Sequence, residues 1–218
     1  STVWTLKNGA KVVVLPTEYK KDQILFTWFK NGGETLIDDA DLPSFEDNIY
    51  GLFQRNSGIS KFSSNEASKM LAGKNLSVSS YISQIRHGIS GSTAPKDLET
   101  ALQIAYLTYC DPRFDEQEYE VGIEQIKAVL PNIINQPSFK LQNEVGRAVY
   151  GPDCKRNVEL NDETLEKANL ATIEKVYRGL FKDAAGLTAV FVGNIDLETF
   201  KPLCEKYIGS IPKGRKAT

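Results

Sequence analysis

Three polar residues, Ser44, Asp47 and Asn48, follow one another at i, i+3 and i+4 in the stretch LPSFEDNIYGLF. If this stretch is helical, the spacing puts all three side chains on one face. Three polar side chains at this spacing are where some enzymes hold a catalytic zinc, but they also form the solvated side of many ordinary helices. The residue types leave both interpretations open.

Apolar residues predict the helix that would carry this polar trio. Phe45, Ile49, Leu52 and Phe53 recur at helical spacing, after a proline of the kind that often begins a helix. We therefore expect a single helix over residues 42–53. Its four apolar side chains should face the core.

His87, in QIRHGIS, is the only histidine of the chain. It lies on an expected strand of alternating polarity, which favours a surface or hydrogen-bonded structural role. A catalytic zinc normally takes three protein ligands, most often with two or three imidazoles among them, so a single histidine excludes that type of site. A Ser-His-Asp hydrolase using His87 stays arithmetically open, although no G-x-S-x-G motif occurs.

Other patterns that carry chemistry are incomplete. Cys110, Cys154 and Cys204 include no C-x-x-C pair, so we expect core or surface thiols rather than a zinc site or a disulfide framework. The glycine-rich stretches lack the P-loop pattern. The acidic clusters at 38–41 and 115–120 lack the spacing of a calcium loop, and we expect them at solvated helix starts.

The totals are those of an ordinary globular chain. It has 218 residues, of which 41% are hydrophobic, enough for a sizeable core. Its 26 basic residues are scattered and outnumbered by 28 acidic ones, which argues against binding nucleic acid. No apolar run is long enough for a transmembrane helix. The chain looks excised from a longer polypeptide, and we expect one domain over residues 1–212 followed by a basic linker over 213–218.

The order of the elements predicts the fold class. A hairpin around Asn8-Gly9 comes first, followed by a strand in DQILFTWFK, a helix with a capping box at Ser63 and two further strands. From Pro95 onward helices dominate, one of them ending before Pro131. An apolar strand, GLTAVFVGN, and an amphipathic helix close the chain. This order predicts an α+β fold, a largely antiparallel sheet with helices packed on one face.

Four stretches, in this order, resemble one homologous unit of the pitrilysin-like (insulinase-type) zinc metallopeptidases, the group that includes mitochondrial processing peptidase. They are WTLKNGAKVVVLP, FKNGGET, TAPKDLETALQIAYLTYCDPRFDEQEYE and AVFVGNIDLETFKPLCEKYIGSIP. The resemblance spans essentially the whole chain. It implies a metallohydrolase-like unit of the pitrilysin and processing-peptidase type.

In active members of this family the helix after the third strand carries H-x-x-E-H, whose histidines bind zinc and whose glutamate is the general base. The resemblance places this motif on residues 44–48 and a distant glutamate ligand near Glu124. Hydroxyl and carboxamide groups are weak Zn²⁺ ligands compared with imidazole. We therefore interpret Ser44, Asp47, Asn48 and Glu124 as positions of a lost metal site, with no catalytic or metal-binding residue in this chain.

The resemblance implies a non-catalytic domain of a larger zinc metallopeptidase, with zinc in the catalytic domain of the full-length protein. Such a domain would line the substrate chamber and pack against the catalytic half, with Phe45, Tyr50 and Phe53 as aromatic anchors between domains. Its partners would be homologous domains, of the same chain or of a partner subunit, and a peptide substrate. The alternative is a structural or assembly subunit related to processing-peptidase core proteins. Resemblance to the large bacterial members suggests the envelope or periplasm.

Overall fold

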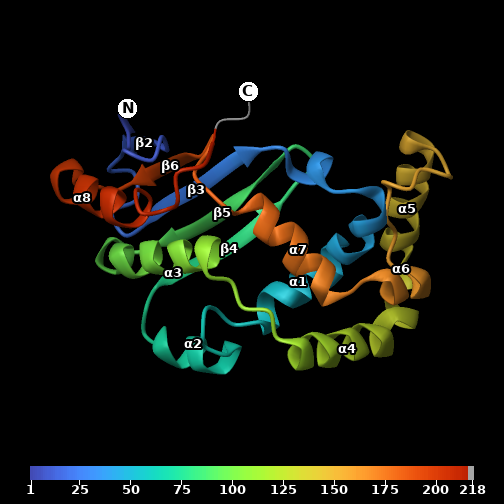
Figure 1. The fold of residues 1–218 in the computed structure, drawn as a ribbon. Helices are drawn as coiled ribbons and strands as arrows, with labels where there is room; N and C mark the ends of the chain where they lie inside the picture. Colours follow the sequence, from blue (N-terminus) through green and yellow to red (C-terminus); the bar gives the residue numbers. More distant parts are fainter. Residues whose placement is uncertain (216–218) are drawn as a thin grey trace. The chain divides into compact units, whose positions relative to one another are not determined.

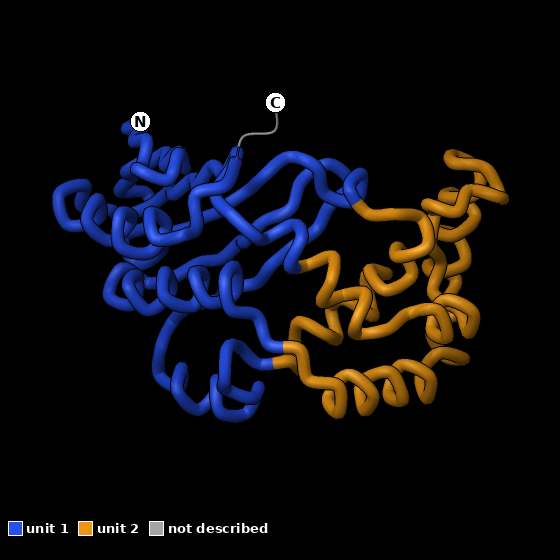
Figure 2. The backbone as a smooth tube through the Cα atoms, viewed as in Figure 1, with its two compact units in different colours: residues 1–36, 58–113, 178–218 blue, residues 37–57, 114–177 orange. Residues whose placement is uncertain are grey.

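The computed structural model describes residues 1–215, which form two compact units interleaved along the sequence (Figure 2). Unit 1 consists of residues 1–36, 58–113 and the described residues from 178 onward, and unit 2 consists of residues 37–57 and 114–177. The chain therefore passes between the units after residues 36, 57, 113 and 177. A single domain over 1–212 stays a prediction, and the expected linker over 213–218 ends outside the described residues.

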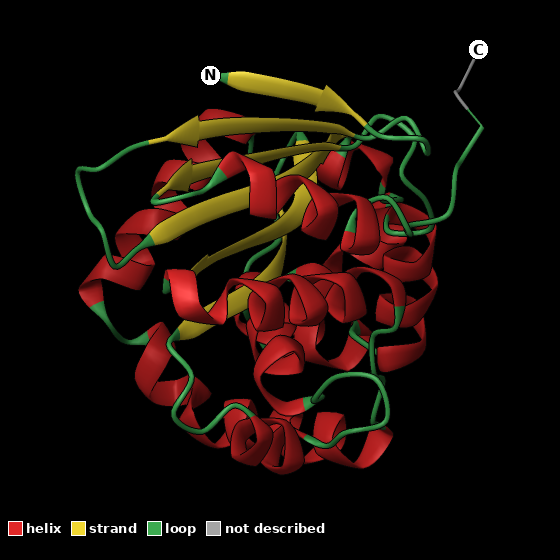
Figure 3. Ribbon diagram, turned by 90° about the vertical axis from the view of Figure 1, so that its left-hand side faces the viewer, coloured by secondary structure: helices red, strands yellow, loops and turns green. Residues whose placement is uncertain are grey.

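Unit 1 is built around a six-stranded sheet with the order β1-β2-β6-β3-β5-β4. Neighbouring strands are antiparallel except β2 and β6, which are parallel, so the predicted largely antiparallel sheet is confirmed. Figure 3 shows β1, next to the N-terminus, at one edge. The strands are β1 (Thr2–Thr5), β2 (Lys11–Pro16), β3 (Ile24–Asn31), β4 (Leu76–Ile82), β5 (Arg86–Thr93) and β6 (Thr188–Gly193).

The first hairpin forms at the predicted turn, where Gly9 adopts a φ of 89°. Asn8 has a second role that the turn pattern does not reveal. Its buried amide donates hydrogen bonds to the carbonyl oxygens of Ile208 and Ile211, at 2.8 and 3.0 Å. The turn is therefore tied to the segment that follows the last helix of unit 1.

Helices cover one face of the sheet, as predicted (Figure 1). Helix α3 (Leu98–Cys110) packs on β4 and β5, and α8 (Leu197–Tyr207) places Phe200 against Phe191 of β6, with ring centroids 4.7 Å apart. Trp28 of β3 is fully buried in the same layer. The shorter helices of unit 1 are η1 (Gly33–Leu36), α2 (Ser64–Met70), which has the predicted capping box, and η3 (Pro95–Asp97).

The opposite face of the sheet exposes apolar side chains. Leu15, Val192 and Leu25 are exposed on adjacent strands, and the register pairs Leu15 with Val192 and Val192 with Leu25. They therefore form one row across β2, β6 and β3, which Ser92 of β5 continues. We call this row of four residues the open row.

Unit 2 is helical. Its elements are η2 (Asp39–Phe45), α1 (Asp47–Asn56), α4 (Glu116–Ile134), α5 (Pro137–Tyr150), α6 (Asp162–Lys167) and most of α7 (Leu170–Leu180), whose last three residues belong to unit 1. Helices α1 and α4 pack closely because Gly122 of α4 leaves room for Leu52 of α1: a Cβ on Gly122 would lie 2.1 Å from Leu52 Cδ2. No helix in residues 1–215 has the length and apolar character needed to cross a bilayer.

The aromatic residues expected to anchor other domains are buried in the core of unit 2. Phe45, Tyr50 and Phe53 are 6%, 7% and 5% exposed. The ring of Phe53 stacks on Tyr50 and on Phe114, with centroids 5.7 and 5.4 Å away. The prediction that these side chains contact other domains is therefore wrong, because they are already packed against one another. The predicted place in the core of Phe45 and Phe53, shared with Ile49 and Leu52, is confirmed.

The expectation that a helix ends before Pro131 is also wrong, because α4 continues to Ile134. A proline inside a helix removes one backbone donor and crowds the preceding turn. Here it falls in the last turns, and the side-chain amide of Asn135 donates to the Pro131 carbonyl oxygen at 2.8 Å. The proline is tolerated because little helix remains after it.

Candidate functional site

The stretch predicted as one helix, residues 42–53, folds as two. The 3-10 helix η2 ends at Phe45, Glu46 is extended with φ −55° and ψ 140°, and α1 begins at Asp47. Ser44 therefore belongs to a different helix from Asp47 and Asn48. The predicted common face of these three side chains does not exist, because apolar spacing identifies the buried residues but not where the backbone changes conformation.

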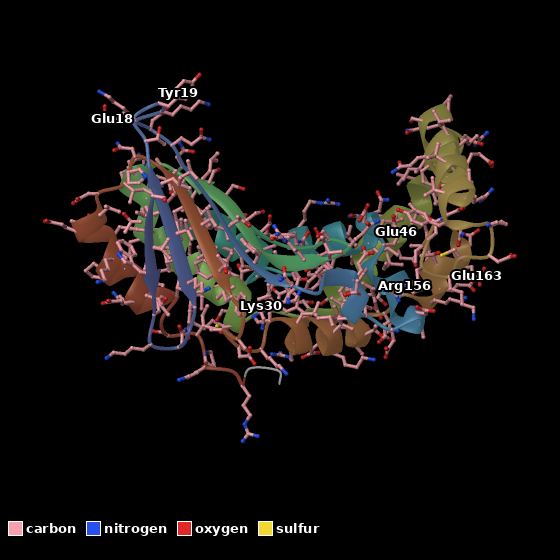
Figure 4. All side chains as sticks on the ribbon, turned by 90° about the horizontal axis from the view of Figure 1, so that it is seen from above. Glu18, Tyr19, Lys30, Glu46, Arg156 and Glu163 are labelled. Atoms are coloured by element: carbon pink, nitrogen blue, oxygen red, sulfur yellow. The ribbon has the colours of Figure 1, made fainter. Side chains whose placement is uncertain are left out.

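Glu46 causes this break by capping α1. Its Oε2 accepts hydrogen bonds from the backbone N–H groups of Asn48 and Ile49, at 2.9 and 3.2 Å, which are donors without partners inside the helix. Its Oε1 accepts from the side-chain amide of Asn48 at 2.9 Å. Burial raises the pKa of the Glu46 carboxyl, and the hydrogen bonds from Asn48 and Ile49 oppose that shift. Figure 4 shows Glu46 at this position. The carboxamide of Asn48 is thus engaged in the cap.

Ser44 is buried and has a structural partner. Its Oγ accepts a hydrogen bond from the backbone N–H of Asn169 at 3.1 Å, just before α7 begins. The hydroxyl therefore satisfies a backbone donor near the start of α7.

Asp47 and Glu124, the two carboxylates among the four predicted positions, lie on exposed surface. Asp47 is in the first turn of α1, where a negative charge is favourable to the helix dipole. Glu124 is on the exposed side of α4, and its Oε1 accepts from Lys127 Nζ at 3.0 Å. An exposed pair of this kind contributes little to stability. Their interpretation as remnants of a metal site stays a prediction.

The four positions do not fit a catalytic zinc. Ser44 and Asn48 present neutral groups, and both are hydrogen-bonded within unit 2. Zinc in a catalytic site prefers imidazole, thiolate and carboxylate ligands. Within residues 1–215, no three His, Cys, Asp or Glu side chains form a group that could hold a metal ion.

His87 is a structural residue. Its Nδ1 accepts a hydrogen bond from the Gly33 N–H at 3.1 Å, and its Nε2 donates to the Leu180 carbonyl oxygen at 3.1 Å. Burial lowers its pKa to about 4. Because both ring nitrogens are engaged with backbone groups, the ring cannot act as the base of a serine hydrolase. The Ser-His-Asp alternative is therefore wrong.

The cysteines are free thiols, as expected. Burial raises the pKa of Cys110 to about 11 and also raises that of Cys204. A thiol with a raised pKa is a poor nucleophile at neutral pH, because the thiolate is the reactive form. These two positions therefore have the properties of core residues.

The acidic clusters lie at helix starts, as predicted. Asp115 is the N-cap of α4, and its Oδ1 accepts from the Glu118 N–H at 3.1 Å. Asp39, in the first turn of η2, accepts from Arg156 at 2.6 Å. Asp115 thus satisfies a backbone donor of its own helix, and Asp39 pairs with an arginine 117 residues along the chain.

A hollow of about 500 Å³ alongside α5 was not expected from the sequence. Arg147 of α5 donates from Nε and Nη2 to the two carboxylate oxygens of Glu159, both at 2.7 Å. The charges at this hollow are therefore largely paired with each other. Its lining contains no histidine or cysteine and consists of Ile134, Phe139, Lys140, Asn143, Glu144, Arg147, Glu159, Leu160 and Asn161.

The opposite side of α5 exposes an apolar stripe. Leu141, Val145 and Val149 are 66%, 53% and 67% exposed, and no residue of α5 is buried. Successive helical residues turn by about 100°, so these three share the side of α5 that faces away from Arg147. We call them the α5 stripe. An amphipathic helix normally turns such a stripe inward, and here it faces outward.

No family model matches the chain. It is 26% identical over 215 residues to a protein of Arabidopsis thaliana called zinc protease PQQL-like, covering 97% of this chain and 20% of that protein. It is 23% identical over 214 residues to the probable zinc protease PqqL of Escherichia coli K12, covering 96% of this chain and 22% of that protein. The chain thus spans about a fifth of the length of these curated relatives.

Solved structures show the same fold. The crystal structure of the periplasmic protease PqqL from Escherichia coli superposes with a TM-score of 0.75 at 19% identity, over 99% of this chain and 24% of that one. A protease from Helicobacter pylori gives a TM-score of 0.76 at 15% identity, over 100% and 52% of the two chains. A peptidase M16 inactive domain from Pseudomonas fluorescens gives 0.74 at 14% identity, over 100% and 52%.

Proposed function

We propose that this chain is a non-catalytic domain of a larger zinc metallopeptidase. The chain is homologous over almost its whole length to zinc proteases of the PqqL type, and it has the fold of a pitrilysin-like (M16) peptidase domain. Zinc and the chemical step would belong to another domain. The present domain would line the substrate chamber and pack against its neighbours.

One observation carries the non-catalytic assignment. The segment where the family places its zinc-binding helix is broken at Glu46, and its polar side chains are used to fix the backbone. Ser44 accepts from Asn169, and Glu46 accepts from Asn48. These bonds give the segment a structural role in unit 2 that would compete with metal binding.

The open row supports a chamber-lining role. It presents three aliphatic side chains, Leu15, Val192 and Leu25, followed by the hydroxyl of Ser92, on one face of the sheet. None of these four side chains carries a charge. A surface of this kind can contact apolar and neutral segments of an unfolded peptide without desolvating a charge.

The α5 stripe supports packing against another domain. Leaving apolar surface in water costs about 25 cal/mol per Å², so a helix gains stability when such a stripe is covered. The relatives are four to five times longer than the aligned segment, which leaves room for further domains in them. In the full-length protein of this chain, the α5 stripe would contact a neighbouring domain.

The assignment predicts that the purified chain does not hydrolyse unfolded peptides. Peptide cleavage, followed by mass spectrometry, should equal that of buffer, with or without added zinc and with or without a chelator. The matched variant is Asp47→Asn, which changes the residue at the general-base position by one atom. Chelator-sensitive cleavage by the wild-type chain that is lost in Asp47→Asn would show an active site and overturn the proposal. Chelator-sensitive cleavage that persists in this variant would come from a contaminating protease.

A further inference from the structure

We propose that His87 is an acid-sensitive latch that fastens two segments of unit 1 to strand β5: residues 32–36 and the C-terminal end of α7. The inference concerns the stability of the fold and does not depend on the proposed function. Three features carry it, namely the hydrogen bonds of the ring, the backbone that those bonds hold and the charges around the ring.

The hydrogen bonds of the ring define a single protonation state. The Gly33 N–H can only donate, so Nδ1 must accept, and the Leu180 carbonyl can only accept, so Nε2 must carry the proton. His87 is 1% exposed, so water cannot replace either partner without movement of the chain. The neutral Nε2–H tautomer is therefore the form that this site holds.

The two held segments are those at which the chain leaves unit 1 and returns to it. Residues 32–36 directly precede the passage into unit 2 after residue 36, and α7 returns to unit 1 after residue 177. The conformation at Gly33, with φ 57°, is one that other residues rarely adopt, and a Cβ there would lie 2.2 Å from the Ser83 carbonyl oxygen. His87 is the acceptor of the Gly33 N–H, so this bond fixes a backbone conformation with little intrinsic preference.

Charged groups around the ring favour its neutral form. Lys30 of β3 is directly paired with His87 in the sheet register, and its positive charge lowers the pKa of His87 in addition to the effect of burial. Asp183 partly neutralises the charge of Lys30, because its Oδ1 accepts a hydrogen bond from Lys30 Nζ at 3.0 Å. Phe181 of the segment after α7 meets the ring edge-on and Ile82 pairs with His87 from β4, so neither offers a counter-charge. Further charged residues next to these contacts along the chain are Arg86, which lies over the ring of Phe29, Glu34, which follows Gly33, and Lys182, which follows Phe181.

Protonation opens the latch. A proton taken from solvent by Nδ1 would face the Gly33 N–H, so two donors would oppose each other and the positive ring would be buried beside Lys30. The folded pKa, about 4, is below the unfolded value, near 6.5, so the unfolded chain binds the proton first as the pH falls. The stability that His87 contributes is complete above pH 6.5 and is lost between pH 6.5 and 4.

The test is an NMR titration of the 218-residue chain, in which His87 gives the only imidazole signals. At pH 7 the ring nitrogens should show the Nε2–H tautomer. Their titration midpoint should lie near 4, and the protection of the amides at residues 32–36, measured against the intrinsic exchange rate at each pH, should fall over the same range. A midpoint near 6.5, an Nδ1–H tautomer, or amide protection at these residues that does not change as His87 is protonated would each overturn the proposal.

Two variants separate the latch from general acid unfolding. In His87→Gln, the amide can accept from Gly33 and donate to Leu180 without titrating, so the acid-dependent loss of protection at residues 32–36 should disappear. In Lys30→Met, the histidine midpoint should rise, because a positive charge beside the ring is removed. Lys11→Met, at an exposed position, is the matched control and should leave the midpoint unchanged. If His87→Gln does not fold, an unchanged midpoint in Lys30→Met still contradicts the proposed electrostatics.

Discussion

Replacing Phe53 by alanine should lower the free energy of unfolding by roughly 4 kcal/mol, within the range for Phe→Ala changes in protein cores. The side chain is buried and its ring lies against Tyr50, Phe114 and Tyr177, with centroid distances of 5.7, 5.4 and 6.5 Å. Alanine would leave a cavity among three large rings that are held by separate helices and loops. Urea unfolding followed by circular dichroism measures the loss.

The matched control for Phe53 is Tyr19→Ala. Tyr19 is 91% exposed and extends from the loop between β2 and β3 (Figure 4). Its removal should change the unfolding free energy by less than about 0.5 kcal/mol, as for most surface substitutions. Equal effects of the two substitutions would restore the interpretation that Phe53 is a docking residue rather than part of the core.

Replacing Gly88 by alanine should prevent folding or cost more than about 3 kcal/mol, the upper end of typical overpacking effects. Gly88 lies on β5 opposite Phe29 of β3, and a Cβ there would lie 1.7 Å from the Trp28 carbonyl oxygen. Because that oxygen belongs to the backbone, it cannot move away by a change of rotamer, as the end of a side chain could. Strands β3 and β5 would have to separate next to His87.

Gly179→Ala is the control for Gly88. Gly179 is in α7, within unit 1, and a Cβ there would meet nothing within 4 Å. Alanine at an exposed helical position should raise stability by up to about 1 kcal/mol, because glycine is the poorer helix former. Thermal unfolding of the two variants should therefore shift in opposite directions. A mild effect of Gly88→Ala would contradict the close approach of β3 and β5.

The sequence predicts the parts of this fold that depend on near neighbours. The hairpin at Asn8-Gly9 and the capping box of Ser63 and Glu66 form as expected, because turn and cap chemistry acts over two to four residues. The α+β class follows from the order of the strands and helices. The apolar spacing around Ile49 correctly identifies the buried side of α1.

The same spacing could not reveal the break at Glu46. Both η2 and α1 bury their apolar residues, and only the hydrogen bonds from Asn48 and Ile49 to the Glu46 carboxylate show where one ends and the other begins. The partner of Ser44 is 125 residues away in the chain. Long-range partners of this kind cannot be inferred from local patterns, and they decide the chemistry of the candidate site.

His87 shows the same limit. Its isolation among strand residues correctly predicts a structural role, but its partners, Gly33 and Leu180, are 54 and 93 residues away. Burial and the acid sensitivity that follows from it depend on those partners. A lone histidine in the sequence thus becomes interpretable only once its two ring contacts are known.

The central claim, that the segment around Glu46 fixes backbone rather than metal, is tested most directly by the zinc content of the purified chain. The wild-type chain and the variants Asp47→Ala and Glu124→Ala are each saturated with zinc and dialysed without chelator. The zinc bound per chain is then measured by mass spectrometry. The account predicts that dialysis removes zinc from all three proteins to the same low level. One retained zinc per wild-type chain, lost in either variant, would contradict it.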